Sequence, residues 1–165
     1  MRFTIEQAFP APLGAVEAAL VDPAYLDRLS TLPKLGRPTL LEQREDEGGE
    51  VVHQSVRYAF VGDLNAAVRR VVDPKRLTWV EEATIDRRSH VTSWRIVPDH
   101  YANLLRSNGT FRLVAEGEGT RRVAEGELKV SVPLVGGKVE QAIVSGLREH
   151  AELEHDVLEE WLRDP

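Results

Sequence analysis

Three residues near the C-terminal end have the types and spacing of a site along a helix. Gly146, His150 and Glu154 follow one another at four-residue intervals, which places them on one side of an α-helix. Imidazole exchanges protons near neutral pH, and a carboxylate one turn away can fix its tautomer. Gly146 has no side chain and leaves room beside His150. The trio predicts a polar ligand anchor or an acid/base group; a core histidine hydrogen-bonded to Glu154 or to a tyrosine of the sheet is the alternative.

Aromatic residues form a second candidate group. They alternate with polar residues in strand-like segments, sharing faces with aliphatic neighbours; they are Tyr58, Trp79, Trp94 and Phe111. On a curved sheet such rings would line a ligand cavity, and in a filled core they would only pack together. His90 falls in register with Trp94 and is a further candidate.

The stretch SVPLVGGKVE at 131–140 has the order strand, glycines, lysine and helix, as phosphate-binding loops do. A phosphate loop requires G-x-x-x-x-G-K followed by Ser or Thr. Here the first glycine is replaced by Val132 and the hydroxyl residue by Val139. We therefore expect no phosphate site, and interpret Pro133 as the end of a strand and Gly136-Gly137 as a hinge before the helix.

Composition excludes other classes of protein. The chain has no cysteine and a net charge of −6, which excludes disulfides and thiolate metal sites and argues against nucleic-acid binding. Arginine pairs at 69–70, 87–88 and 121–122 are interpreted as solvated strand ends and turns. With no metal-ligand pattern and no long apolar run, we expect no metal, no cofactor, no integral membrane association and a cytoplasmic protein.

The elements that must position these residues follow from periodicity. Alternation predicts a strand over 2–9, and Pro12 and Asp22-Pro23 each open a short helix. From 38 to 132 the period is two, with turn signals every 10–14 residues that include Asn108-Gly109. A long helix is predicted over 138–163. This order indicates an α+β fold in which an antiparallel sheet packs on one long helix.

The same order resembles the helix-grip fold of the SRPBCC superfamily, which includes START lipid-transfer domains, polyketide cyclases and the birch-pollen allergen class. The likeness is carried by RFTIEQAF, PLGAVEAALVDPAYL and GEGTRRVAEGELKVSVPLVGGKVEQ. The GELKVSVPLVGGKVE segment is similar to an uncharacterised bacterial branch of that superfamily. The resemblance implies one domain over 1–165, with a curved sheet of seven to eight strands gripping the final helix. It also implies a cavity between them for an apolar or amphipathic ligand.

The leading hypothesis is therefore the binding, transport or sequestration of a hydrophobic or amphipathic small molecule, such as a lipid or polyketide, rather than catalysis. A cyclase or dehydratase with His150 as general base, assisted by Tyr58 or Glu154, is the first alternative. A regulatory domain that binds a protein partner and no ligand is the second, and it would show a large exposed apolar patch.

Overall fold

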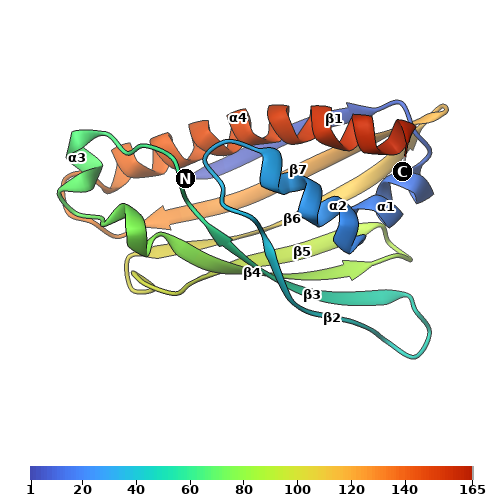
Figure 1. The fold of residues 1–165 in the computed structure, drawn as a ribbon, viewed down its shortest axis with the longest axis horizontal. Coiled ribbons are helices and arrows are strands. Elements are labelled where there is room, and N and C mark those ends of the chain that lie inside the picture. Colours follow the sequence, from blue (N-terminus) through green and yellow to red (C-terminus); the bar gives the residue numbers. More distant parts are fainter. Residues whose placement is uncertain (165) are drawn as a thin grey trace.

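The computed structural model describes residues 1–164. A seven-stranded antiparallel sheet, two short helices near its start and one long C-terminal helix form the molecule, and Figure 1 shows the long helix lying along one side of the curved sheet. The strands are β1 (Arg2–Phe9), β2 (Thr39–Glu45), β3 (Val51–Ala59), β4 (Thr78–Asp86), β5 (Val91–Pro98), β6 (Leu105–Glu116) and β7 (Gly119–Val130). The helices are α1 (Leu13–Leu20), α2 (Pro23–Arg28), α3 (Ala66–Arg69) and α4 (Gly136–Arg163), with 3-10 turns at Leu29–Thr31 and Pro74–Arg76. The expected α+β helix-grip architecture is confirmed.

The sheet is a meander closed by its first strand. The strand order is β1-β7-β6-β5-β4-β3-β2, so the two edges are β1 and β2. The chain passes from β1 to β2 through α1 and α2, which cover one end of the sheet (Figure 1). Asp22 caps α2 by accepting a hydrogen bond from the Ala24 amide at 2.8 Å, and Pro23 follows it, as the sequence predicts.

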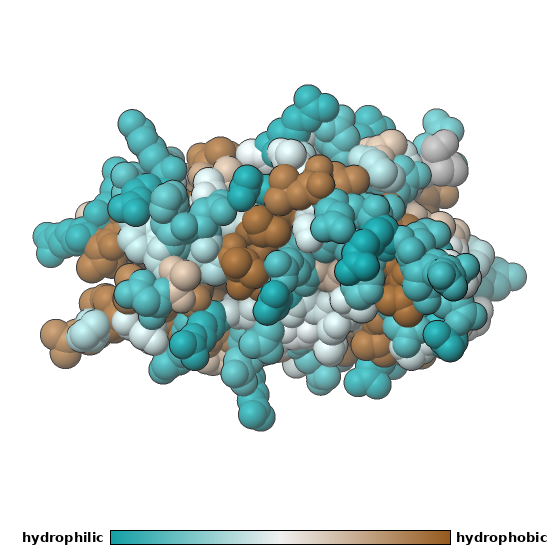
Figure 2. Space-filling view, turned by 90° about the horizontal axis from the view of Figure 1, so that it is seen from below, coloured by the Kyte–Doolittle hydropathy of each residue, from teal (hydrophilic) through white to brown (hydrophobic). Residues whose placement is uncertain are grey.

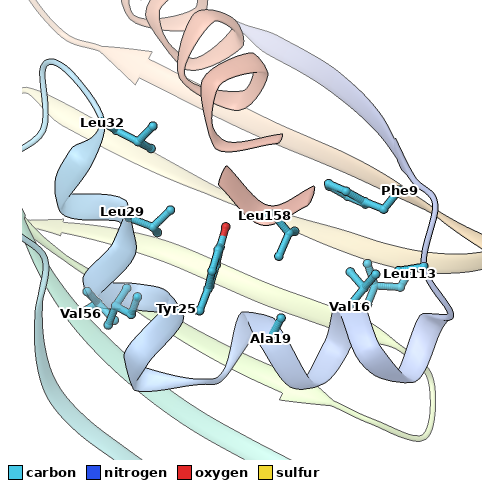
Figure 3. Packing of buried hydrophobic residues seen from close by; sticks show 11 residues of the cluster. Phe9, Val16, Ala19, Tyr25, Leu29, Leu32, Val56, Leu113 and Leu158 are labelled. Atoms are coloured by element: carbon cyan, nitrogen blue, oxygen red, sulfur yellow. The ribbon is translucent and has the colours of Figure 1, made fainter. Parts of the chain in front are cut away.

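The main hydrophobic core lies at the end of the sheet that α1 and α2 cover. Phe9 and Val16 pack there with Leu158 of α4, and Tyr25 of α2 stands among them (Figure 3). Val56 and Leu113 add the floor from β3 and β6. A smaller cluster of Phe3, Leu128 and Val144 joins the N-terminal half of α4 to β1 and β7. The two clusters fix the long helix over one half of the sheet.

Asn108-Gly109 is not a turn, contrary to the prediction, because both residues lie inside β6. Gly109 is paired with Gly126 of β7. A Cβ at Gly109 would lie 2.2 Å from the Glu125 carbonyl oxygen and 2.6 Å from the Trp94 ring. The Trp94 ring and that of Phe3, stacked with centroids 6.4 Å apart, pack against this pair of glycines. Glycine is required here for close packing of an aromatic ring, and no chain reversal is involved.

The start of α4 also differs from the prediction. The helix begins at Gly136 rather than at 138, and the left-handed residue of the preceding turn is Leu134, with φ 67°. Gly136 is needed for a different reason, because a Cβ there would lie 2.5 Å from the Val130 carbonyl oxygen. The chain therefore turns at Leu134, and Gly136 lets the helix start against the end of β7.

Candidate functional site

The four predicted aromatic residues all lie on the side of the sheet that faces α4. Tyr58 and Trp79 are paired across β3 and β4 and stack with ring centroids 5.9 Å apart. Trp94 joins the Phe3 cluster beneath α4, and Phe111 lies under the guanidinium of Arg122. Every one of the four is half-buried rather than fully enclosed. The rings are therefore gathered on one face that solvent still reaches.

This face is incompletely covered because of where α4 lies. The helix packs against β1, β7, α1 and α2, whereas the sheet continues beyond it through β5, β4 and β3 (Figure 1). We call the half-buried part of this side, which reaches Trp94 at the edge of α4, the inner aromatic face; its members are Tyr58, Trp79, Glu81, Trp94, Ile96 and Phe111. All six are half-buried. Solvent therefore reaches every member of the inner aromatic face.

A buried ion pair lies beside the inner aromatic face. Arg122 of β7 donates from Nη2 to Glu154 Oε2 at 2.6 Å and from Nη1 to Glu154 Oε1 at 3.3 Å. Its Nε donates to Gln7 Oε1 at 2.7 Å, and the Gln7 amide in turn donates to the Ala151 carbonyl at 2.7 Å. Tyr25 hydroxyl and Glu154 Oε1 are 3.4 Å apart. The bidentate geometry satisfies both charges together.

Arg122 and Glu154 both remain charged in the interior because each compensates the charge of the other. Burial alone would raise the pKa of Glu154, but the Arg122 guanidinium outweighs burial and holds that pKa below its usual value. Arg122 also lies 5.6 Å from the ring centroids of Phe9 and Phe111, within cation–π range. Burial and the Glu154 carboxylate raise the pKa of Tyr25, so its hydroxyl remains neutral. The group of side chains is thus neutral overall.

Glu81 is the unusual titratable group of this region. It lies on β4 between Val56 of β3 and Ile96 of β5, on the inner aromatic face. Burial, reinforced by the Glu154 carboxylate and opposed by Arg122, raises the pKa of Glu81 to about 7. Within residues 1–164 its carboxyl has no hydrogen bond or ion pair that would compensate its charge. A carboxyl in this state can give or take a proton at neutral pH, or bind a ligand group.

His150 lies at the side of the buried surface of α4. The fully buried positions include Val144, Ala151 and Leu158, so the centre of that surface is one residue, or about 100°, away from His150. Burial lowers the pKa of His150, which keeps the imidazole neutral. Glu154, expected to hold the imidazole, instead binds Arg122 and Tyr25. The tautomer of His150 is therefore not fixed by Glu154.

Gly146 and His90 lie in different surroundings. A Cβ at Gly146 would meet no atom within 4 Å, so there is open space beside this turn of α4. His90 lies in the turn before β5 with φ 57°, and its Nδ1 is 3.0 Å from Glu17 Oε1 of α1. It is therefore placed at the end of the sheet beneath α1. A ligand-binding role for either residue stays a prediction.

Sequence reasoning missed Glu81 and Arg122. The interpretation of the 121–122 pair as solvated is wrong for Arg122, which is 7% exposed. Strand alternation could have indicated both. Glu81 is two residues after Trp79 and Arg122 is six residues before Leu128, so each shares a face of its strand with an inward-pointing apolar side chain. Charge alone favours solvent exposure for both residues, whereas strand alternation places both on the inner side of the sheet.

A concavity of about 540 Å³ lies across β2–β5 on the other side of the sheet and is lined mainly by outward-facing polar residues, among them Glu42, Arg44, Glu82 and Arg95. Arg95 is paired with Glu82 at 2.5 Å and Arg44 with Glu42 at 3.3 Å. Its charges already have partners, so it is a weaker candidate site. Across residues 1–164, no three His, Asp or Glu side chains converge as metal ligands, and no helix is long and apolar enough to span a membrane.

Comparison with solved structures defines the class of fold. The chain is similar to the protein TTHA0849 from Thermus thermophilus, with 20% identity, coverage of 98% of this chain and 97% of that one, and a TM-score of 0.71. It is similar to the Zhui aromatase/cyclase from Streptomyces sp. R1128, with 16% identity, coverage of 99% and 93%, and a TM-score of 0.69. It is also similar to norcoclaurine synthase from Thalictrum flavum, with 15% identity, coverage of 100% of this chain and 87% of that one, and a TM-score of 0.63. These likenesses show that the fold is the helix grip, as expected.

Within that class the chain belongs to the family described as "Protein of unknown function (DUF2505)", whose model matches residues 4–162. No curated protein matches the chain.

Proposed function

We propose that this protein binds a hydrophobic or amphipathic small molecule, in the cytoplasm, on the inner aromatic face alongside α4. The observation that carries the proposal is a run of half-buried rings, Tyr58, Trp79, Trp94 and Phe111, on the same side of the sheet as the carboxyl of Glu81, which has no partner among the described residues. Covering these rings would contribute about 25 cal/mol for each Å² of apolar surface removed from water. Polar groups at one point of an apolar surface are typical of small-molecule sites.

The fold comparisons support this proposal in a general way. Two proteins of similar fold are named as an aromatase/cyclase and as a norcoclaurine synthase, names that state chemistry on small molecules. We extend small-molecule binding, and no particular ligand, to this chain. Figure 2 shows a narrow apolar band among polar residues on the face it presents, rather than a broad apolar surface. A domain that binds a protein partner and no ligand would present a large exposed apolar patch, so this face favours small-molecule binding over that alternative.

Tryptophan fluorescence offers a direct test. Trp79 and Trp94 lie on the inner aromatic face, whereas Trp161 packs against Tyr25 with ring centroids 5.9 Å apart. Amphipathic molecules should therefore change the emission of the folded protein, and Trp79→Phe should remove part of the change. Native mass spectrometry should detect the same complexes. A folded protein that takes up no apolar or amphipathic molecule by either method would overturn the proposal.

A blocking variant locates the site. Gly146→Leu places an apolar side chain in the open space beside α4 and should weaken uptake without unfolding the protein. Gly14→Leu is the matched control, because Gly14 is also helical and its Cβ would also meet nothing within 4 Å. Equal uptake by the two variants would exclude the surface beside Gly146.

Catalysis is a second candidate, favoured by one observation. Glu81 has a pKa raised to about 7 by burial, which suits a general acid or base at neutral pH. His150, kept neutral by burial, is the other proton acceptor, whereas Glu154 is held ionised by Arg122. For any turnover that is found, Glu81→Gln and His150→Ala should each lower kcat. A turnover that neither substitution changes would exclude this mechanism.

A further inference from the structure

The interior beside α4 contains one negative charge more than positive charges once Glu81 ionises. Glu81 faces Arg122 of β7 and Glu154 of α4, and these two neutralise each other. The remaining groups around it are neutral: Tyr58 of β3, Tyr25 of α2 and His150 of α4. Ile96 of β5 has no charge. Arg122 makes no hydrogen bond or ion pair with Glu81, because its guanidinium is directed to Glu154 and Gln7.

The surroundings of this charge are aromatic. Trp79 is two residues before Glu81 on β4. Tyr58 of β3 is paired with Trp79 and stacks on it, so it is the diagonal neighbour of Glu81. The faces of Tyr and Trp attract organic cations through the negative side of the ring quadrupole. A carboxylate beside two such rings is the combination that recognises an alkylammonium group. Trp94 and Phe111 continue the same face as apolar surface.

We propose that the ligand of the inner aromatic face is an amphipathic organic cation, a hydrophobic amine or quaternary ammonium compound, whose ammonium group pairs with Glu81 against Tyr58 and Trp79. The proposal rests on the proposed function and names the chemical class of its ligand. The apolar part of the ligand extends along Trp94 and Phe111. A ligand cation supplies the charge that no side chain of the cluster supplies.

The same balance of charge disfavours anionic amphiphiles. Arg122 is the arginine of this cluster and the natural anchor for a carboxylate or sulfate head group, but Glu154 occupies it in bidentate fashion. An anion would have to displace Glu154 and leave a second buried carboxylate without a partner. Selectivity for cation over neutral molecule over anion is therefore expected.

Three probes with the same decyl chain test this order: decyltrimethylammonium, decanol and decyl sulfate, each below its micelle concentration. Their affinities are measured by tryptophan fluorescence and calorimetry. At about pH 8.5 the cation should bind at least about tenfold more tightly than decanol, a difference that one partly buried ion pair supplies. If only ionised Glu81 binds the cation, its affinity should fall about thirtyfold at about pH 5.5, where some 3% of a carboxyl of pKa about 7 is ionised. Decyltrimethylammonium does not titrate, so the change reports the protein.

Two neighbouring substitutions identify the group. Glu81→Gln should bring the cation within about threefold of decanol and abolish the pH dependence, because a neutral amide supplies no charge. Glu82→Gln is the matched control, since Glu82 is the next residue of β4 and is paired with Arg95 on the opposite face. It should leave all three affinities unchanged.

The outcomes separate the two proposals. Binding of decanol or decyl sulfate at least as tight as that of the cation would overturn the cation proposal and leave small-molecule binding in place. A cation preference that Glu81→Gln leaves intact would overturn it as well. If none of the three probes binds the folded protein, the proposed function itself is contradicted. Should Glu81→Gln fail to fold, the pH profile of the wild-type protein decides the matter alone.

Discussion

Replacing Glu81 by glutamine should make the protein more stable at neutral and alkaline pH. The ordinary pKa of 4.5 applies to this carboxyl in the unfolded chain, and burial raises the pKa to about 7 in the folded protein. Between these two values the folded protein holds a proton that the unfolded chain has released. Stability therefore falls as pH rises from about 4.5 to about 7, and the penalty is complete above that range.

The size of the effect follows from the shift in pKa. A difference of about 2.5 units at 1.36 kcal/mol for each unit gives about 3 kcal/mol. Glutamine has nearly the same shape and no charge, so Glu81→Gln should remove this penalty. The free energies of unfolding of variant and wild type should be close at about pH 4.5 and differ by about 3 kcal/mol at about pH 8.

Urea unfolding at a series of pH values, followed by circular dichroism, measures both free energies. Other titrating groups are common to the two proteins and cancel in the difference. Glu82→Gln removes one exposed ion pair with Arg95, so its effect should remain below about 1 kcal/mol at every pH. Parallel stability curves for the wild type and Glu81→Gln between about pH 5 and about pH 8 would refute the reasoning, because the folded carboxyl would then titrate normally.

Three further outcomes follow from the contacts. Arg122→Met should cost about 3–5 kcal/mol of unfolding free energy by leaving Glu154 buried and unpaired, and adding Glu154→Gln should restore much of it; no recovery in the double variant would contradict the pairing. Gly146→Ala should raise the melting temperature, contributing up to about 1 kcal/mol, because nothing opposes the new Cβ. Gly109→Ala should lower it by several degrees, since the new Cβ would lie 2.2 Å from the Glu125 carbonyl oxygen; an unchanged melt would show that β6 can move.

Strand alternation predicts the inner aromatic face because it is a local property of the chain. Successive side chains of a strand point to opposite faces, so the parity of Tyr58, Trp79 and Trp94 can be read without knowing which strands are neighbours. The structure places all three on the side facing α4. Whether a helix covers that side depends on tertiary packing, and only the structure shows that β3, β4 and β5 extend beyond α4.

Buried charge is harder to predict, because a charge enters the interior only when partners from distant segments meet it. The partners of Arg122 are Gln7 and Glu154, which are 115 and 32 residues away in the chain. Nothing local to RRVAEGELKV indicates them. Glu81 is the opposite case, because it is inside and has no partner among the described residues. A rule that places paired charges inside and unpaired ones outside would have missed it, and that departure makes it a functional candidate.

The long helix shows how an averaged pattern can mislead about one residue. A helical wheel adds all apolar positions into one direction, yet α4 packs its N-terminal half on the Phe3–Leu128 cluster and its C-terminal half on α1 and α2. On such a wheel the apolar residues Val139, Ile143, Val157 and Trp161 all lie within about 20° of His150. The fully buried side chains along the middle and C-terminal part of α4 instead recur every seven residues, at Val144, Ala151 and Leu158. His150 precedes Ala151 by one residue and is left half-buried at the side. The helical pattern thus marks a half-buried side chain at the border of both contacts, one turn from the open space at Gly146.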